Sequence, residues 1–148
     1  MAQVVELKSK TGEFGHAVVR IALVEPPDDY GWARFEFEAE AERLQVQAAI
    51  SLFADDGLAG GHANVGLPDF LDDLVADWRG WEGTREWESL DRDLSLQATH
   101  HGRFIKIVFV FCRDRQPDAW EARVPIALAP GESLSSFARD VRGLWGYS

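Results

Sequence analysis

Carboxylates recur at two places in this sequence with a spacing that puts each group on one surface. The first group is Asp69, Asp72, Asp73 and Asp77. Intervals of three to four residues place most of these side chains on one side of a helix. The second group is Glu36, Glu38 and Glu40, which alternation places on one face of a strand. Such surfaces usually face only water, but they can also steer a basic protein partner, so both groups are candidate partner-binding residues.

Three tryptophans within ten positions form a second group with binding chemistry: Trp78, Trp81 and Trp87. Indole rings stack on sugars, bases and cations, so Trp81 and Trp87 are candidate ligand-binding residues. The ordinary role of tryptophan is burial, because its side chain removes a large apolar area from water. The sequence favours this structural role for the cluster and leaves open whether Trp81 faces solvent.

Histidine and cysteine are poorly placed for metal or nucleophilic chemistry. His100 and His101 are adjacent, so on a strand they would point to opposite faces and could not easily share one ion. Cys112 ends an apolar segment and is expected to be an inert thiol. The chain has no Gly-x-Gly-x-x-Gly and no Gly-x-Ser-x-Gly motif. We therefore expect no metal and no cofactor, and a non-enzymatic role is favoured while catalysis stays open.

Composition narrows the classes of partner. The 148 residues fit one ordinary domain, and 46% hydrophobic with 27% charged residues is typical of a folded globular protein. A net charge of −10 argues against binding to nucleic acid or to an anionic membrane surface. The longest apolar segment, residues 105–112, is too short to cross a bilayer. A single cysteine and an N-terminus unlike a signal peptide lead us to expect a cytoplasmic protein.

The elements that must position these side chains follow from hydrophobic periodicity. Strands are predicted over residues 3–8, 16–24, 32–39, 44–52, 94–99, 104–112 and 120–126, and helices over residues 67–78 and 133–142. Residues 104–112 are apolar on both faces, which predicts a central strand, and Pro125 predicts that its strand either lies at an edge or ends there. Short turns between strands predict antiparallel pairing. We predict one α+β domain over residues 1–148, a curled antiparallel sheet of about seven to eight strands with two helices packed against it.

The segment from residue 66 to residue 140 resembles a family of small bacterial proteins classed as a domain of unknown function. The residues that carry the resemblance are Phe70-Leu71-x-x-Leu74, Trp78-Arg79-Gly80-Trp81-x-Gly83-x-x-x-Trp87-x-Ser89-Leu90, residues 94–102 and Pro130-Gly131-Glu132-x-Leu134. The resemblance implies no reaction. The layout is also similar to that of WapI-type immunity proteins, which place a helix before a run of strands, end in a helix and neutralise a toxin. That similarity is one of layout alone.

Three functional hypotheses follow from these observations. The leading one is a non-enzymatic protein-binding module, immunity-like, that presents an acidic face from residues 67–78 and 32–39 to a basic protein. The second is a small-molecule binder or enzyme with a pocket lined by Trp81 and Trp87. The third is self-association through an exposed strand edge. The identity of any partner and the oligomeric state stay open.

Overall fold

The strands form two antiparallel sheets, each built from consecutive strands. The computed structural model describes residues 4–9, 16–53, 66–112 and 120–144. The first sheet has the order β1 (Val4–Lys8), β2 (Ala17–Glu25), β3 (Trp32–Ala41) and β4 (Leu44–Phe53). The second has the order β5 (Thr84–Glu88), β6 (Leu94–His100), β7 (Ile105–Cys112) and β8 (Glu121–Leu128). The helices are α1 (Leu67–Ala76) and α2 (Glu132–Leu144). The α+β class and antiparallel pairing are confirmed.

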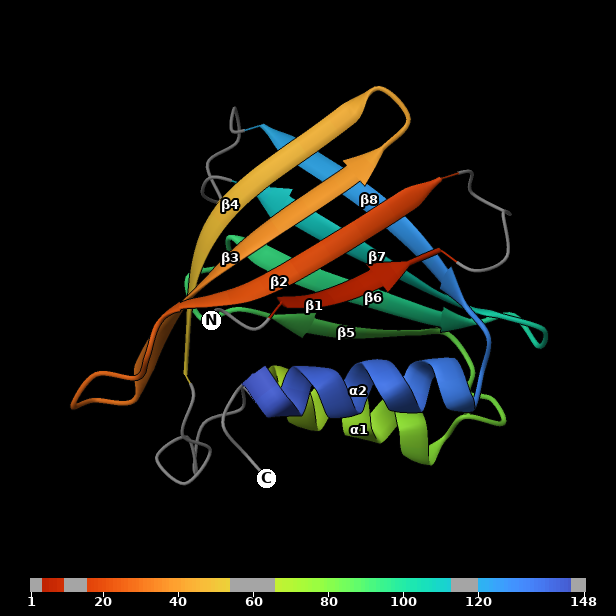
Figure 1. Cartoon of the computed structure of the whole chain (residues 1–148). Helices are drawn as coiled ribbons and strands as arrows, with labels where there is room; N and C mark the ends of the chain where they lie inside the picture. The colour runs from red at the N-terminus through yellow and green to blue at the C-terminus, as the bar shows by residue number, and fades with distance from the viewer. Residues whose placement is uncertain (1–3, 10–15, 54–65, 113–119, 145–148) are drawn as a thin grey trace.

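The prediction of one curled sheet is wrong, because the strands divide into two four-stranded sheets. The interval between β4 and β5 holds α1, and within the described ranges no backbone ladder joins these two strands. Each sheet has one apolar face, and the two faces bury each other: Phe37 of β3 and Phe111 of β7 meet edge to face at 6.2 Å between ring centroids. Figure 1 shows the sheets as two facing layers.

The alternation in β3 builds the first sheet as its sequence predicts. Phe35, Phe37 and Ala39 are fully buried, while the glutamates between them point away from the core. β3 pairs with β4 in an unbroken register from Trp32 opposite Phe53 to Ala41 opposite Leu44. The result is one apolar inner face and one polar outer face on the same sheet.

In the second sheet, β7 is a central strand and β8 an edge strand, which confirms both predictions. The inward side chains of β7 are fully buried: Ile105, Ile107, Phe109 and Phe111. Strand β5 begins at Thr84, before Trp87, where the prediction had strands resume only after Trp87. It was missed because five residues with three charges give too few apolar positions to show a period of two.

The two helices lie side by side along one open side of the two layers, with α2 against α1 and β1 (Figure 1). Pro68 stands in the first turn of α1, where its missing N–H costs nothing. The helix ends at Ala76, two residues earlier than predicted, so Trp78 lies beyond it and is 45% exposed. Neither helix in the described part of the chain has the length and apolarity needed to span a membrane.

Candidate functional site

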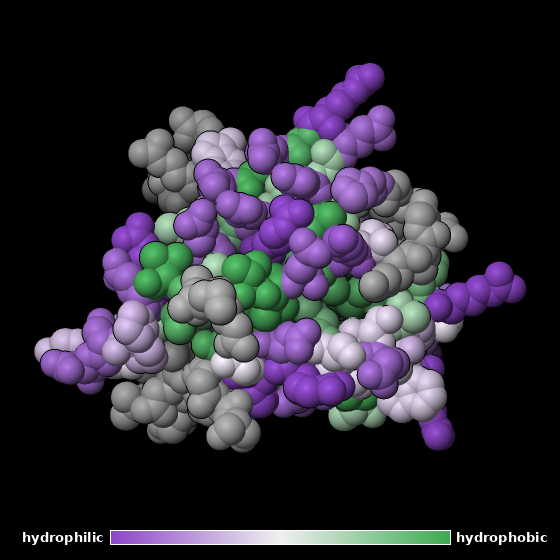
Figure 2. All heavy atoms as spheres, in the orientation of Figure 1, coloured by the Kyte–Doolittle hydropathy of each residue, from purple (hydrophilic) through white to green (hydrophobic). Residues whose placement is uncertain are grey.

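The outer face of the first sheet carries polar side chains in rows that run across all four strands. Glu6 of β1 lies opposite Arg20 of β2, and Arg20 lies opposite Glu38 of β3. Glu38 in turn lies opposite Gln47 of β4. Figure 2 shows hydrophilic side chains gathered over this sheet. Glu36, Glu38 and Glu40, here called the β3 carboxylates, occupy its middle.

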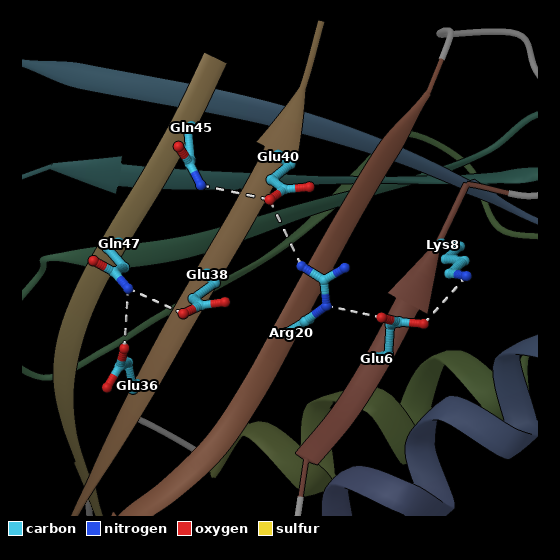
Figure 3. Close-up of polar contacts among 8 residues, drawn as sticks. All are labelled: Glu6, Lys8, Arg20, Glu36, Glu38, Glu40, Gln45 and Gln47. Carbon is cyan, nitrogen blue, oxygen red and sulfur yellow. Dashed lines mark hydrogen bonds and ion pairs between the residues drawn. The ribbon is translucent and has the colours of Figure 1, made fainter.

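Arg20 holds two of the carboxylates on this surface, those of Glu6 and Glu40. Its Nε donates to Glu6 Oε2 at 2.8 Å, and its Nη1 lies 3.8 Å from Glu40 Oε1 (Figure 3). Lys8 adds a second cation 3.4 Å from Glu6 Oε1. The hydrogen bond from Arg20 lowers the pKa of Glu6, and the same bond raises the pKa of Arg20. Glu6 and Glu40 are therefore balanced by cations of the same sheet.

Glu36 and Glu38 are held by an amide instead of a cation. Gln47 Nε2 donates to Glu38 Oε1 at 3.0 Å and to Glu36 Oε1 at 3.3 Å (Figure 3). Among the residues that the structure describes, no lysine or arginine forms a salt bridge with either carboxylate. A neutral amide orients two carboxylates without cancelling their charge. This pair can accept hydrogen bonds from an arginine or lysine supplied from outside.

The lowered pKa of Glu6 gives a pH prediction. A carboxyl group whose pKa is lower in the folded chain contributes stability above its unfolded pKa, near 4.5, and loses it as pH falls through the folded pKa. The urea midpoint of the wild type should therefore fall more steeply below about pH 4.5 than that of Glu6→Gln. Equal slopes would show that the Arg20 bond adds no stability. Glu82→Gln, an exposed carboxylate on the turn before β5, is the matched control.

The aspartates of α1 lie in a different environment from the β3 carboxylates. Asp69 and Asp72 share the guanidinium of Arg142 from α2, with oxygens 2.8 and 2.6 Å from Nη2. The bond to Asp69 raises the pKa of Arg142, while burial lowers it. Asp77 pairs with Arg85 of β5 at 2.7 Å. Three of the four aspartates of this group, all except Asp73, thus form ion pairs within the chain. These contacts fasten α1 to its neighbours and neutralise much of its charge.

The two acidic groups do not form one continuous face. β2 and β1 stand between β3 and the helices in the sheet order, and α2 packs on β1 (Figure 1). A cleft of about 380 Å³ between β1 and α2 extends the acidic surface of the first sheet toward α2. It is lined by Glu6, Lys8, Glu132, Asp140 and Phe137, among others. Acidity therefore extends from the first sheet toward α2 and not toward α1.

The three tryptophans have three different environments. Trp87 is buried in the core at 6% exposure, whereas Trp78 is exposed, with the Arg79 guanidinium 5.3 Å from its ring centroid. Trp81 is half-buried, and its Nε1 donates to the Ala98 carbonyl at 3.3 Å. Arg85 covers the Trp81 ring at 5.0 Å. The contacts of Trp81 and Trp87 are those of packing residues, and neither lines the cleft between β1 and α2.

The two adjacent histidines have separate structural partners. Gly102 N–H donates to His100 Nδ1 at 3.1 Å, so His100 carries its proton on Nε2 and donates to the Trp78 carbonyl at 2.8 Å. His101 Nε2 pairs with Thr99 Oγ1 at 2.8 Å. Among the described residues, no three side chains of the His, Cys, Asp and Glu types are grouped to hold a metal. His100 ties the turn before β5 to the end of β6.

That turn depends on two glycines. Gly80 has φ +148° and Gly83 has φ +75°, in the left-handed half of conformational space that side chains disfavour. Together they carry the chain from the end of α1 into β5. The tryptophan–glycine run is thus a structural connection, with His100 as its anchor.

Sequence reasoning did not assign a role to Gln47, Arg20 and Glu6. Their signal was present, because a tight turn at residues 42–43 sets Glu38 opposite Gln47 once the two flanking strands are paired. Arg20 and Glu6 could not be placed in the same way, since the connection between β1 and β2 does not reveal its register from sequence. The rows become visible only when all four strands are aligned.

Comparison with known proteins adds the family. The model of a family of unknown function, DUF6228, matches residues 12–147. The chain belongs to this family. The match extends well beyond the segment 66–140 on which the resemblance was based, so the DUF6228 fold includes most of the first sheet as well. No curated protein and no solved structure matches the chain. That the tryptophan–glycine run is a signature of DUF6228, and that the layout is that of WapI-type immunity proteins, stay predictions.

Proposed function

We propose that this DUF6228 member is a non-enzymatic protein-binding module that presents the β3 carboxylates to a basic protein. The observation that carries the proposal is the arrangement of Glu36 and Glu38, which one amide of Gln47 orients while no lysine or arginine of the described residues forms a salt bridge with them. Arg20 lies opposite Glu38, but its ion pairs are to Glu6 and Glu40. Carboxylates fixed before binding lose little conformational freedom when an arginine or lysine reaches them. Their charge is therefore available to a partner.

The sheet supports this role better than α1 does. Asp69 and Asp72 are bound to Arg142, and Asp77 is bound to Arg85, so a partner would have to compete with internal ion pairs. Asp69, Asp72, Asp73 and Asp77 remain candidate contacts at the margin of an interface. The β3 carboxylates form its proposed centre.

The net charge of −10 supports a basic partner, because a surface of one sign accelerates association with the opposite sign. In its finer form the proposal is an immunity-like inhibitor that works in a bacterial cytoplasm and covers a basic toxin. The polar outer face of a four-stranded sheet suits this mode of action, since inhibition by covering needs area and not a pocket.

The test is capture from lysate of the native host with three tagged proteins: wild type, Glu36→Gln with Glu38→Gln, and Asp72→Asn with Asp73→Asn. Mass spectrometry identifies what each retains, and calorimetry then measures affinity for the captured protein. We expect a basic protein on wild type and on the helix variant, and affinity weaker by about tenfold or more for the sheet variant. Circular dichroism checks that all three are folded.

Each other outcome decides against part of the proposal. Capture lost only by the helix variant would move the interface to α1. Equal capture by all three proteins would exclude both acidic groups. Capture of no basic protein by the wild type would contradict the protein-binding function itself.

A further inference from the structure

β4 is the outermost strand of the first sheet on the side away from the helices (Figure 1). Its ladder to β3 is continuous, and within the described ranges no backbone hydrogen bond reaches its other edge. Every second residue of such a strand presents an N–H and a C=O that lack a strand partner. The edge is ten residues long, which equals the length of β3 and exceeds that of every other strand in the described residues.

The composition of β4 is as unusual as its length. Residues 44–53 read Leu-Gln-Val-Gln-Ala-Ala-Ile-Ser-Leu-Phe, with no charged residue, no proline, no glycine and no bulge in the register. Natural edge strands are normally protected by such features. The other three edges of this chain have them: Glu6 and Lys8 on β1, three charges on β5, and Pro125 on β8. Among the four edges that the described residues form, only that of β4 lacks such a feature.

We propose that β4 pairs antiparallel with β4 of a second copy, which forms a two-fold dimer with one continuous eight-stranded sheet. A strand that pairs with itself about a two-fold axis places like residues near like residues. For a charged strand that is repulsive, whereas β4 offers only neutral side chains. A charged foreign strand, by contrast, would find no opposite charge on β4. The composition therefore selects a second copy of this chain.

The register follows from the alternation of faces. Both copies keep their apolar faces on one side only if residues of the same face lie opposite each other. The axis then passes through Ala48 or Ala49, at the middle of the strand. With the axis at Ala48, Val46 lies opposite Ile50 on the inner side and Gln45 lies opposite Ser51 on the outer side. With the axis at Ala49, Val46 lies opposite Leu52 and Gln47 lies opposite Ser51. Small residues at the centre let the two backbones approach without a steric clash.

The β3 carboxylates of the two copies do not prevent this pairing. The two β3 strands would be three inter-strand spacings apart, or about 14 Å at roughly 4.8 Å each. The Debye length at physiological ionic strength is about 8 Å, so their repulsion is largely screened. One strand pair is a small contact beside the roughly 1,200–2,000 Å² of stable interfaces. We accordingly expect a weak dimer whose population rises with concentration.

Analytical ultracentrifugation over a wide concentration range tests the proposal on three proteins. Ala49→Lys adds one ammonium group per copy on the exposed outer side of β4, where the two groups would lie opposite or diagonal across the seam. Val4→Lys adds the same charge on the exposed outer side of β1 and is the matched control. Wild type and Val4→Lys should dimerise alike, and Ala49→Lys should dissociate at least about tenfold more readily.

The outcomes separate cleanly, because thermal unfolding confirms that each variant is folded. A wild type that stays monomeric up to its solubility limit overturns the proposal. So does a dimer that Ala49→Lys leaves unchanged, or one that Val4→Lys disrupts equally. Hydrogen exchange gives a second readout, since the β4 amides that do not bond to β3 should gain protection with concentration in the wild type and not in Ala49→Lys.

Discussion

Replacing Phe37 with alanine is expected to lower the free energy of unfolding by about 3–5 kcal/mol. The Phe37 side chain is fully buried and meets Phe111 of the opposite sheet edge to face. Its loss removes apolar area and leaves a cavity between the two layers, where neither backbone ladder can shift to fill it. Urea denaturation followed by tryptophan fluorescence measures the change.

Tyr30→Ala provides the control for that experiment. Tyr30 is also aromatic and lies on the turn before β3, but it is 75% exposed. We expect its replacement to change stability by no more than about 0.5 kcal/mol. If Phe37→Ala also cost less than about 1 kcal/mol, the two sheets could not be packed through this residue.

Trp87→Ala is expected to cost about 3–5 kcal/mol, whereas Trp78→Ala should cost less than about 1 kcal/mol. The two residues belong to the same tryptophan-rich run, so their difference reports position and not chemistry. Trp87 is on the inner side of β5 and is 6% exposed, while Trp78 lies beyond the end of α1. Equilibrium unfolding of both variants, monitored by far-UV circular dichroism, gives the comparison.

The fluorescence of the folded variants supplies an independent check. Removing a buried indole should shift the remaining emission toward longer wavelengths, and removing an exposed one should shift it toward shorter wavelengths. Similar stability losses in the two variants would mean that both indoles contribute equally to the core. The distinction between Trp87 as a core residue and Trp78 as an exposed one would then be wrong.

Short-range features of the fold could be predicted from the sequence. Alternation in residues 32–39 assigned Phe35 and Phe37 to the core and the glutamates to the surface, because a strand has a period of two. The apolar side chains of α1 followed from a period of 3.6, and the central position of β7 followed from apolar residues on both faces. These inferences need only neighbouring residues.

Long-range relations could not be predicted in this way. Nothing near Asp69 and Asp72 indicates that Arg142, on the last helix, binds both of them. Periodicity gives the buried face of each strand but not the sheet to which the strand belongs, and for that reason one sheet was expected where there are two. The contacts of Gln47 with Glu36 and Glu38 lie between these two cases, because they can be predicted once the register of a single hairpin is known.

The division of the strands into two consecutive sets has a consequence for the order of synthesis. Every backbone pairing of the first sheet lies within residues 4–53, so all four of its strands have been synthesised before α1 is translated. Its inner face, with Phe35 and Phe37, must then wait for the second sheet. If the ladder forms at that stage, it leaves an apolar side uncovered, the kind of surface on which molecular chaperones act.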